Sequence, residues 1–167
     1  MIIGIILVWL MFLGIGEAAA EWENRVFLKG LRSLTVIVEA KSCEAYGTLE
    51  SRVKTDTESA LRQSGIKVLA GLKPEIGNTR LAIIIGCYSA KEPSTNTIAF
   101  FTGVEVGQFI PWSDKSSKVS PVLVMTWRTG IAVGITNAKA IDEDIRKYTR
   151  DRVTEFIKAW LSVNPRK

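Results

Sequence analysis

The sequence predicts an α+β domain, in which a mixed, mostly antiparallel sheet of about five to six strands has two main helices packed on it. The chain closes on a long amphipathic helix at residues 141–161, and its middle carries a series of β-rich runs that such a helix could cover. One early helix and one late helix, with strands between them, give the order β-α-β-β-β-β-β-α. This order is typical of an α+β domain.

The final helix is predicted from apolar side chains that recur at helical spacing on one face, with charged side chains on the other. The apolar face comprises Ile141, Ile145, Tyr148, Val153, Phe156, Ile157 and Trp160. Burying each large apolar side chain contributes roughly 1.5–3 kcal/mol, so this face is expected to pack on the sheet. Asn137 is the expected N-cap of the helix.

The remaining elements follow from β-branched runs and turn residues. Strands are predicted at residues 34–38, 66–69, 81–85, 98–106, 119–128 and 131–135. Thr48 is the expected N-cap of a helix that runs to about Ser64 and joins the first two strands, with Gly65 as its left-handed stop. Gly103 and Gly107 indicate a bend or bulge. Residues 111–118 are predicted to form a polar loop. Alternation in the next strand places Val119, Leu123, Met125 and Trp127 on one face.

The first twenty residues resemble an export signal. Residues 2–15 are an almost unbroken apolar run, shorter than the about 20 residues that span a membrane. They are followed by Ala18-Ala19-Ala20, which suits signal cleavage. We therefore expect residues 1–20 to be a signal peptide, 21–30 a lead-in segment and 31–167 a single domain, periplasmic or secreted, with no membrane span after cleavage. An uncleaved anchor is the alternative.

Composition excludes several classes of function. The chain has a formal net charge of +5 and no histidine. Its basic residues are dispersed rather than interleaved with aromatic residues on one strand, so no nucleic-acid partner is expected. The absence of histidine excludes Ser–His–Asp and Cys–His catalysis and histidine-based zinc sites, and no glycine-rich phosphate loop occurs. We expect no enzyme activity, no catalytic or metal-ligating residues and no cofactor.

The two cysteines, Cys43 and Cys87, suggest one disulfide in an exported protein. Both lie just past the ends of predicted strands, at residues 34–38 and 81–85. The bridge therefore requires these two strands to run parallel and side by side. Two buried thiols that act as small hydrophobes are the alternative.

Two charged features of the last helix favour structural roles. Asp142, Glu143 and Asp144 are consecutive, so their side chains point in different directions and suit the helix N-terminus rather than one metal. Arg152 falls inside the apolar face. We expect its stem to lie along the core with its head at the edge, or else a buried partner, Glu39 or Glu105.

Two tryptophans are the best sequence indication of a binding surface. Trp112 lies beside Pro111 and Trp22 lies in the lead-in segment, and neither has an evident core position. Tryptophan is enriched at interaction hot spots, although it also fills gaps in a core. Trp127 and Trp160 are expected in the core.

The mature chain resembles a family of small uncharacterised secreted or periplasmic bacterial proteins. The likeness rests on residues 28–31 and 36–39, Leu61-Arg62-Gln63-Ser64-Gly65-Ile66, Thr126-Trp127 and the closing run from Phe156 to Pro165. These are packing and capping signatures, and they imply no activity. The strand and helix order also resembles, by topology alone, the amino-terminal domain of TolB.

The sequence therefore leads to two functional hypotheses and leaves the oligomeric state open. The first is an exported, non-catalytic binding or adaptor domain that contacts a protein or envelope component through a sheet edge and Trp112. The second is a small-ligand carrier with a pocket between the sheet and the C-terminal helix. A deep apolar cavity under that helix would favour the carrier, and a solid core would argue against it.

Overall fold

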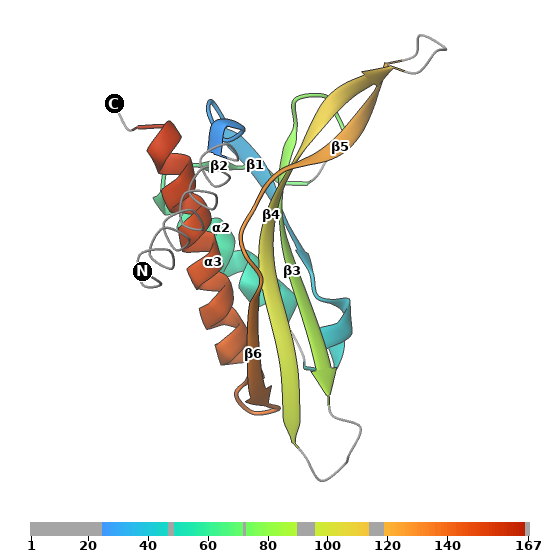
Figure 1. The fold of residues 1–167 in the computed structure, drawn as a ribbon, viewed down its shortest axis with the longest axis vertical. Helices are drawn as coiled ribbons and strands as arrows, with labels where there is room; N and C mark the ends of the chain where they lie inside the picture. The colour runs from blue at the N-terminus through green and yellow to red at the C-terminus, as the bar shows by residue number, and fades with distance from the viewer. Residues whose placement is uncertain (1–24, 47–48, 72, 90–95, 114–118, 166–167) are drawn as a thin grey trace, which may run out of the picture.

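The computed structural model describes residues 25–46, 49–71, 73–89, 96–113 and 119–165. Within them the predicted α+β order is confirmed (Figure 1). The elements are β1 (Ser33–Glu39), η1 (Lys41–Tyr46, a 3-10 helix), α2 (Leu49–Gln63), β2 (Lys67–Val68), β3 (Thr79–Ser89), β4 (Thr97–Ser113), β5 (Val119–Arg128), β6 (Ala132–Asn137) and α3 (Ile141–Val163).

The described strands form one open, mixed sheet. Its order is β2-β1-β3-β4-β5, and β6 is added beside β4. β1 pairs in parallel with both β2 and β3. The parallel pairing with β2 is possible because α2 carries the chain back between the two strands. The pairings of β4 with β3, β5 and β6 are antiparallel. The predicted mixed, mostly antiparallel sheet is therefore confirmed.

β4 is the longest of these strands and has three neighbours. One edge pairs with β3 over residues 98–108. Its other edge is shared, since residues 97–102 pair with β6 and residues 105–113 pair with β5. The bulge expected near Gly107 is present, but the extra residue belongs to β5: Val106 pairs with Trp127 and Gly107 with Met125.

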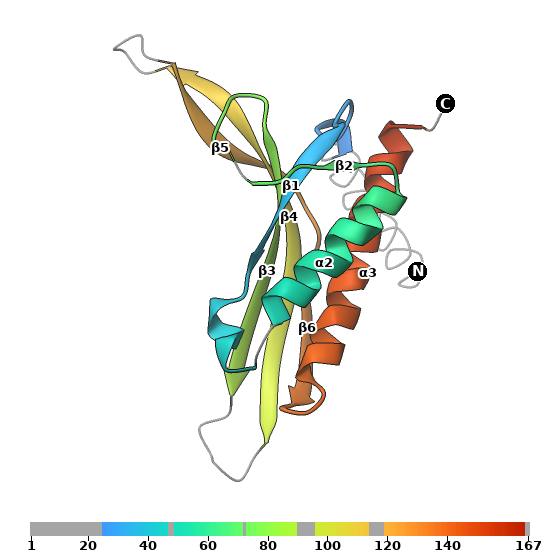
Figure 2. The ribbon, with the colours of Figure 1, turned by 180° about the vertical axis from the view of Figure 1, so that it is seen from behind.

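The two α-helices pack on one face of the sheet, and Figure 2 shows α2 crossing that face beside α3. Their apolar faces meet strand residues of one parity. The core includes Leu34, Val36, Val38, Leu81, Ile83, Ile85, Phe100, Val104, Val106, Ile145, Val153 and Phe156. The ring of Phe100 packs edge-on against Tyr148, and Trp127 packs in the same way against Phe156, each at 5.3 Å between centroids. Trp127 and Trp160 are buried, as expected.

Strand parity separates a helix-covered face from an open face of the sheet. Phe100, Thr102 and Val104 of β4 point toward the helices and are buried. The alternate residues, such as Phe101 and Glu105, point to the other face, because successive side chains of a strand alternate. Neither described α-helix lies on this open face (Figures 1 and 2).

The capping of α3 differs from the prediction. The N-cap is Ala140, and no side chain caps it. Asn137 instead lies at the end of β6, where its side-chain oxygen accepts hydrogen bonds from the backbone N–H groups of Lys139 and Ala140. It therefore stabilises the turn that precedes the helix. The prediction of Asn137 as N-cap was wrong by three residues, and the predicted cap of α2, Thr48, lies outside the described residues.

The described part of the lead-in segment is bound to the end of α3. Leu28 is buried in the core, and its carbonyl accepts a hydrogen bond from the side-chain amide of Asn164. The Asn164 oxygen accepts from the N–H of Gly30. Trp160 donates its indole N–H to the carbonyl of Leu31 at 2.8 Å. The predicted signal peptide at residues 1–20 lies outside the described residues.

Two predictions about the region after Gly107 were wrong. Pro111 to Ser113 belong to β4 rather than to a loop, because they pair with residues 119–121 of β5. The four residues assigned to one face of β5 do not share one environment, since Trp127 is buried whereas Val119 and Met125 are exposed. The bulge explains the second error, because one extra residue reverses the side-chain alternation.

Candidate binding surfaces

The far end of the β4–β5 hairpin forms a ribbon that projects beyond the rest of the sheet (Figure 1). We call residues 109–113 and 119–123 the ribbon. Pairing of β4 with β3 ends at Gln108, and beyond Phe109 the described partner of β4 is β5. The ribbon strands contain no charged residue. Its exposed large apolar side chains are Ile110, Trp112, Val119 and Val122.

Trp112 lies on the exposed part of the ribbon. The residue is 61% exposed, so it has no core position. It pairs across the ribbon with Ser120, whose small side chain leaves the indole uncovered. The other predicted contact, Trp22, lies outside the described residues, so the structure does not bring the two together.

A second apolar surface lies on the open face of the sheet. The pairings of β3 with β4 and of β4 with β6 place Gly86, Phe101 and Val133 in one row across the strands. Tyr88, Ala99 and Ile135 form the next row, and Ile84 and Gly103 continue the surface on the other side of the first row. None of these residues is charged. We call this surface the open-face patch. Sequence reasoning missed it, although the alternating Ile131, Val133 and Ile135 carried the signal.

Glycines let the patch pack closely. A Cβ atom on Gly86 would lie 2.0 Å from a ring carbon of Phe101, so the ring of Phe101 lies directly on this glycine. The ring also stacks against Tyr88 at 6.3 Å between centroids. These contacts keep Phe101 half-buried and leave Tyr88 exposed at the end of β3.

Cys43 and Cys87 are brought together by the parallel pairing that their bridge requires. β1 and β3 are adjacent and parallel, with Val36 opposite Leu81. η1 then folds back against the end of β3, so the Cα atoms of the two cysteines lie 5.2 Å apart and their sulfur atoms 2.05 Å apart. Both cysteines are buried, in keeping with a structural rather than a catalytic position.

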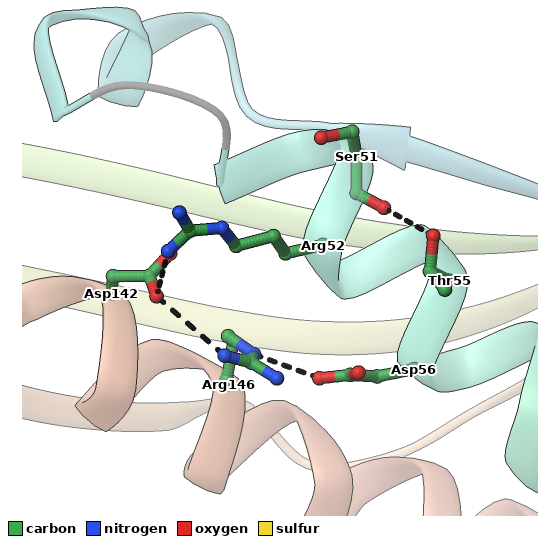
Figure 3. A network of polar contacts seen from close by, with 6 residues as sticks. All are labelled: Ser51, Arg52, Thr55, Asp56, Asp142 and Arg146. Atoms are coloured by element: carbon green, nitrogen blue, oxygen red, sulfur yellow. Dashed lines mark hydrogen bonds and ion pairs between the residues drawn. The ribbon is translucent and has the colours of Figure 1, made fainter.

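A chain of alternating charges joins α2 to α3 (Figure 3). Arg52 contacts Asp142 at 2.9 Å, and Arg146 contacts Asp56 at 2.8 Å and Asp142 at 3.7 Å. The hydrogen bond and charge of Asp56 raise the pKa of Arg146 above its ordinary value. The carboxylates of Asp56 and Asp142 are thus both paired with guanidinium groups. The cluster therefore connects the two helices and contains no unpaired acid or base.

Two further charged residues of α3, Asp144 and Arg152, contact neighbouring side chains. The carboxylate of Asp144 accepts a hydrogen bond from the hydroxyl of Thr136, so Asp142 and Asp144 point to different partners. Arg152 pairs with Glu155 at 2.9 Å along the same helix. The expectation that the head of Arg152 lies at the edge of the core is confirmed, since its side chain is 29% exposed, although its Nε atom is buried without a hydrogen-bond partner. The alternative, a buried partner Glu39 or Glu105, was wrong.

The space between the sheet and α3 is filled by side chains. Ile145 and Phe156 of α3 and Val104 of β4 have no exposed surface. A groove of about 250 Å³ lies instead between α2 and α3, lined by the Asp56–Arg146 pair. The ligand-carrier hypothesis therefore lacks the pocket that it requires.

Within the described ranges, no group of three Cys, Asp or Glu side chains is placed to hold a metal ion. No helix in these ranges is long and apolar enough to cross a membrane.

The geometry defines an α+β domain with one helix-covered and one open sheet face. No family model matches the chain, and no curated protein matches its sequence. Among solved structures, it is similar to a neuraminyllactose-binding hemagglutinin homologue from Helicobacter pylori. That match has 12% identity, covers 78% of this chain and 83% of the other, and has a TM-score of 0.40.

Two further similar structures are bacterial lipoproteins. Rare lipoprotein B from Shewanella oneidensis has 10% identity and a TM-score of 0.34, with 78% of this chain and 96% of that chain covered. A minor lipoprotein from Acinetobacter baumannii has 10% identity and a TM-score of 0.38, with 78% and 90% covered. None of the three is a TolB domain, and such identities and TM-scores do not assign the chain to a family.

Proposed function

We propose that the chain is a non-catalytic binding or adaptor domain of the bacterial envelope that holds its partner through the ribbon. The projecting, uncharged ribbon with Trp112 at its far end carries this proposal. Exposed aromatic side chains supply large contact areas at low entropic cost, and they dominate many interfaces. The absence of histidine and the pairing of the α2–α3 carboxylates with arginines support a role without catalysis.

The proposed location is periplasmic or secreted, with residues 1–20 removed. It is supported by the apolar run at residues 2–15 and by the approach of the two cysteine sulfurs to bonding distance, since disulfides persist in oxidising compartments. The partner is a protein or another component of the envelope, without nucleic acid. Trp22 stays a candidate second contact.

Photo-crosslinking in the producing cell tests the proposed contact. A photoreactive residue at position 112 is expected to give one defined product, and the same residue at Lys158, on the exposed side of α3, is the control. Trp112→Ala should reduce capture of the same partner by at least about tenfold, as expected for loss of an aromatic hot spot. A product that forms equally from position 158, or capture that Trp112→Ala leaves unchanged, would contradict the proposal.

A further inference from the structure

The described sheet has three edge strands, and they differ in how they are protected against pairing with another strand. β2 has only two residues, of which one is Lys67. β5 carries Pro121 on the ribbon and ends in Arg128. β6 has six residues and contains neither a charge nor a proline. Short length, charge and proline are the usual devices that prevent edge pairing, so β6 is the unprotected edge.

The backbone of β6 has groups available for a further strand. The backbone carbonyl of Val104 on β4 accepts a hydrogen bond from the N–H of Thr129, and the N–H of Val104 donates to the Thr129 hydroxyl, so both groups point to the edge of β4 where β6 lies. The backbone N–H of Phe109 donates instead to the carbonyl of Asn78, on the β3 edge. Because these directions alternate along a strand, residues 98, 100 and 102 point their backbone groups toward β6. They pair with residues 136, 134 and 132. The backbone groups of Val133 and Ile135 therefore point away from β4, where no described strand pairs with them.

The side chains of the same residues are exposed and apolar. Val133 is 68% exposed and Ile135 is 77% exposed, and Ile131 just before the strand is similarly uncovered. All three point to the open face, where Val133 and Ile135 are part of the open-face patch and Ile131 adjoins it at Gly103. The segment 129–138 contains no charged residue, although the whole chain carries a net charge of +5.

We propose that a second copy of this chain pairs with β6, antiparallel and about a two-fold axis at Val133. An antiparallel edge is complementary to itself, as a two-fold interface requires. In this register Val133 lies opposite its own counterpart and Ile131 lies opposite Ile135, so each apolar side chain meets another. No like charges are brought together along the paired segment, which is the condition a net-positive chain must meet to associate with itself. The two sheets become one, and their open-face patches join.

The β6 edge is separate from the ribbon, so its pairing with a second copy goes beyond the proposed function. Sedimentation velocity of the protein as purified from its producing cell, from micromolar to millimolar concentration, should show a concentration-dependent dimer. Val133→Lys places two ammonium groups opposite each other and should weaken the dimer at least about tenfold. Val119→Lys makes the same change on β5, at a valine that is 58% exposed, and should leave the dimer intact.

A cysteine substitution tests the register without depending on the lysine variant. Hydrogen-bonded antiparallel partners have Cα atoms about 5.5 Å apart, within the range of a disulfide. Val133→Cys should therefore give a reductant-sensitive covalent dimer, and Val119→Cys should not.

Three results would overturn the proposal: a monomer at every concentration, a dimer that survives Val133→Lys in a folded protein, or no covalent dimer from Val133→Cys. Each of these results can be distinguished from failure of the ribbon proposal, because the ribbon proposal is tested separately by crosslinking at position 112. Loss of the dimer with unchanged crosslinking at position 112 leaves the proposed function standing.

Discussion

At the scale of single residues, a buried hydroxyl pair shows how the sheet and α3 are matched. The side-chain oxygens of Thr102 on β4 and Thr149 on α3 lie 3.1 Å apart, and both residues are almost fully buried. Thr149 lies among the buried, mostly apolar residues of the helix face. One hydroxyl donates to the other, so this hydrogen bond satisfies one donor and one acceptor in an otherwise apolar interface.

We expect Thr102→Val and Thr149→Val each to lower the free energy of unfolding by about 1–2 kcal/mol, because each leaves one buried hydroxyl without its partner. The double variant should be close to the wild type, since it removes both polar groups at similar volume. Urea unfolding of the four proteins measures the coupling. Additive losses would show that each hydroxyl bonds elsewhere, for example to the carbonyl one turn earlier in α3 for Thr149.

At the scale of elements, the parallel pairing of β1 with β3 places the segment that follows β1 next to the end of β3. η1 carries Cys43 back onto the end of β3, and the hydroxyl of Ser42 accepts a hydrogen bond from the N–H of Cys87. The segment closed by the two cysteines spans 44 residues and includes α2 and β2. A bridge at this point therefore joins the start of the fold to the centre of its sheet.

We expect the bridge between Cys43 and Cys87 to form in the exported protein and to stabilise it by about 4 kcal/mol, the chain-entropy value for a loop of this length. Cys43→Ser/Cys87→Ser should lower the thermal midpoint accordingly. Intact mass after alkylation, with and without reductant, detects the bond directly. Two alkylatable thiols in the unreduced wild type would contradict this prediction.

At the scale of the whole molecule, the packing is uneven along β4. The first two-thirds of β4 have β3 along one edge and β6 or β5 along the other, and α3 packs on them. The ribbon extends past both the helices and β3 (Figures 1 and 2). Isolated two-stranded hairpins are marginally stable in water. The ribbon therefore depends on its base, where Phe109 bonds to the backbone of residues 77 and 78.

Hydrogen exchange should report this difference. We expect backbone amides in residues 81–87 and 98–106 to exchange only through global unfolding, and ribbon amides to exchange through local opening well below that free energy. Urea dependence measured by mass spectrometry or NMR separates the two classes. Ribbon amides that exchange as slowly as those of β3 would indicate that another surface covers the ribbon, such as a bound partner.

The sequence alone determined most of the element order. The apolar periodicity of residues 141–161 located α3, and β-branched runs located the six strands, because both signals are local along the chain. The absence of histidine likewise excluded whole classes of catalysis. The position of each cysteine just past a strand linked a bridge to parallel, adjacent β1 and β3, and the two strands do pair in this way.

Only the tertiary structure decided which surfaces stay open. Pro111 and Trp112 belong to a strand because β5 pairs with them across the hairpin, and the bulge opposite Val106 changes which β5 residues are buried. Arg152 takes a partner one turn away rather than one on the sheet. The unprotected edge of β6 exists because β4 is long enough to hold two partners along one side. Cross-strand register and edge position depend on contacts between distant parts of the chain, and local periodicity carries no information about them.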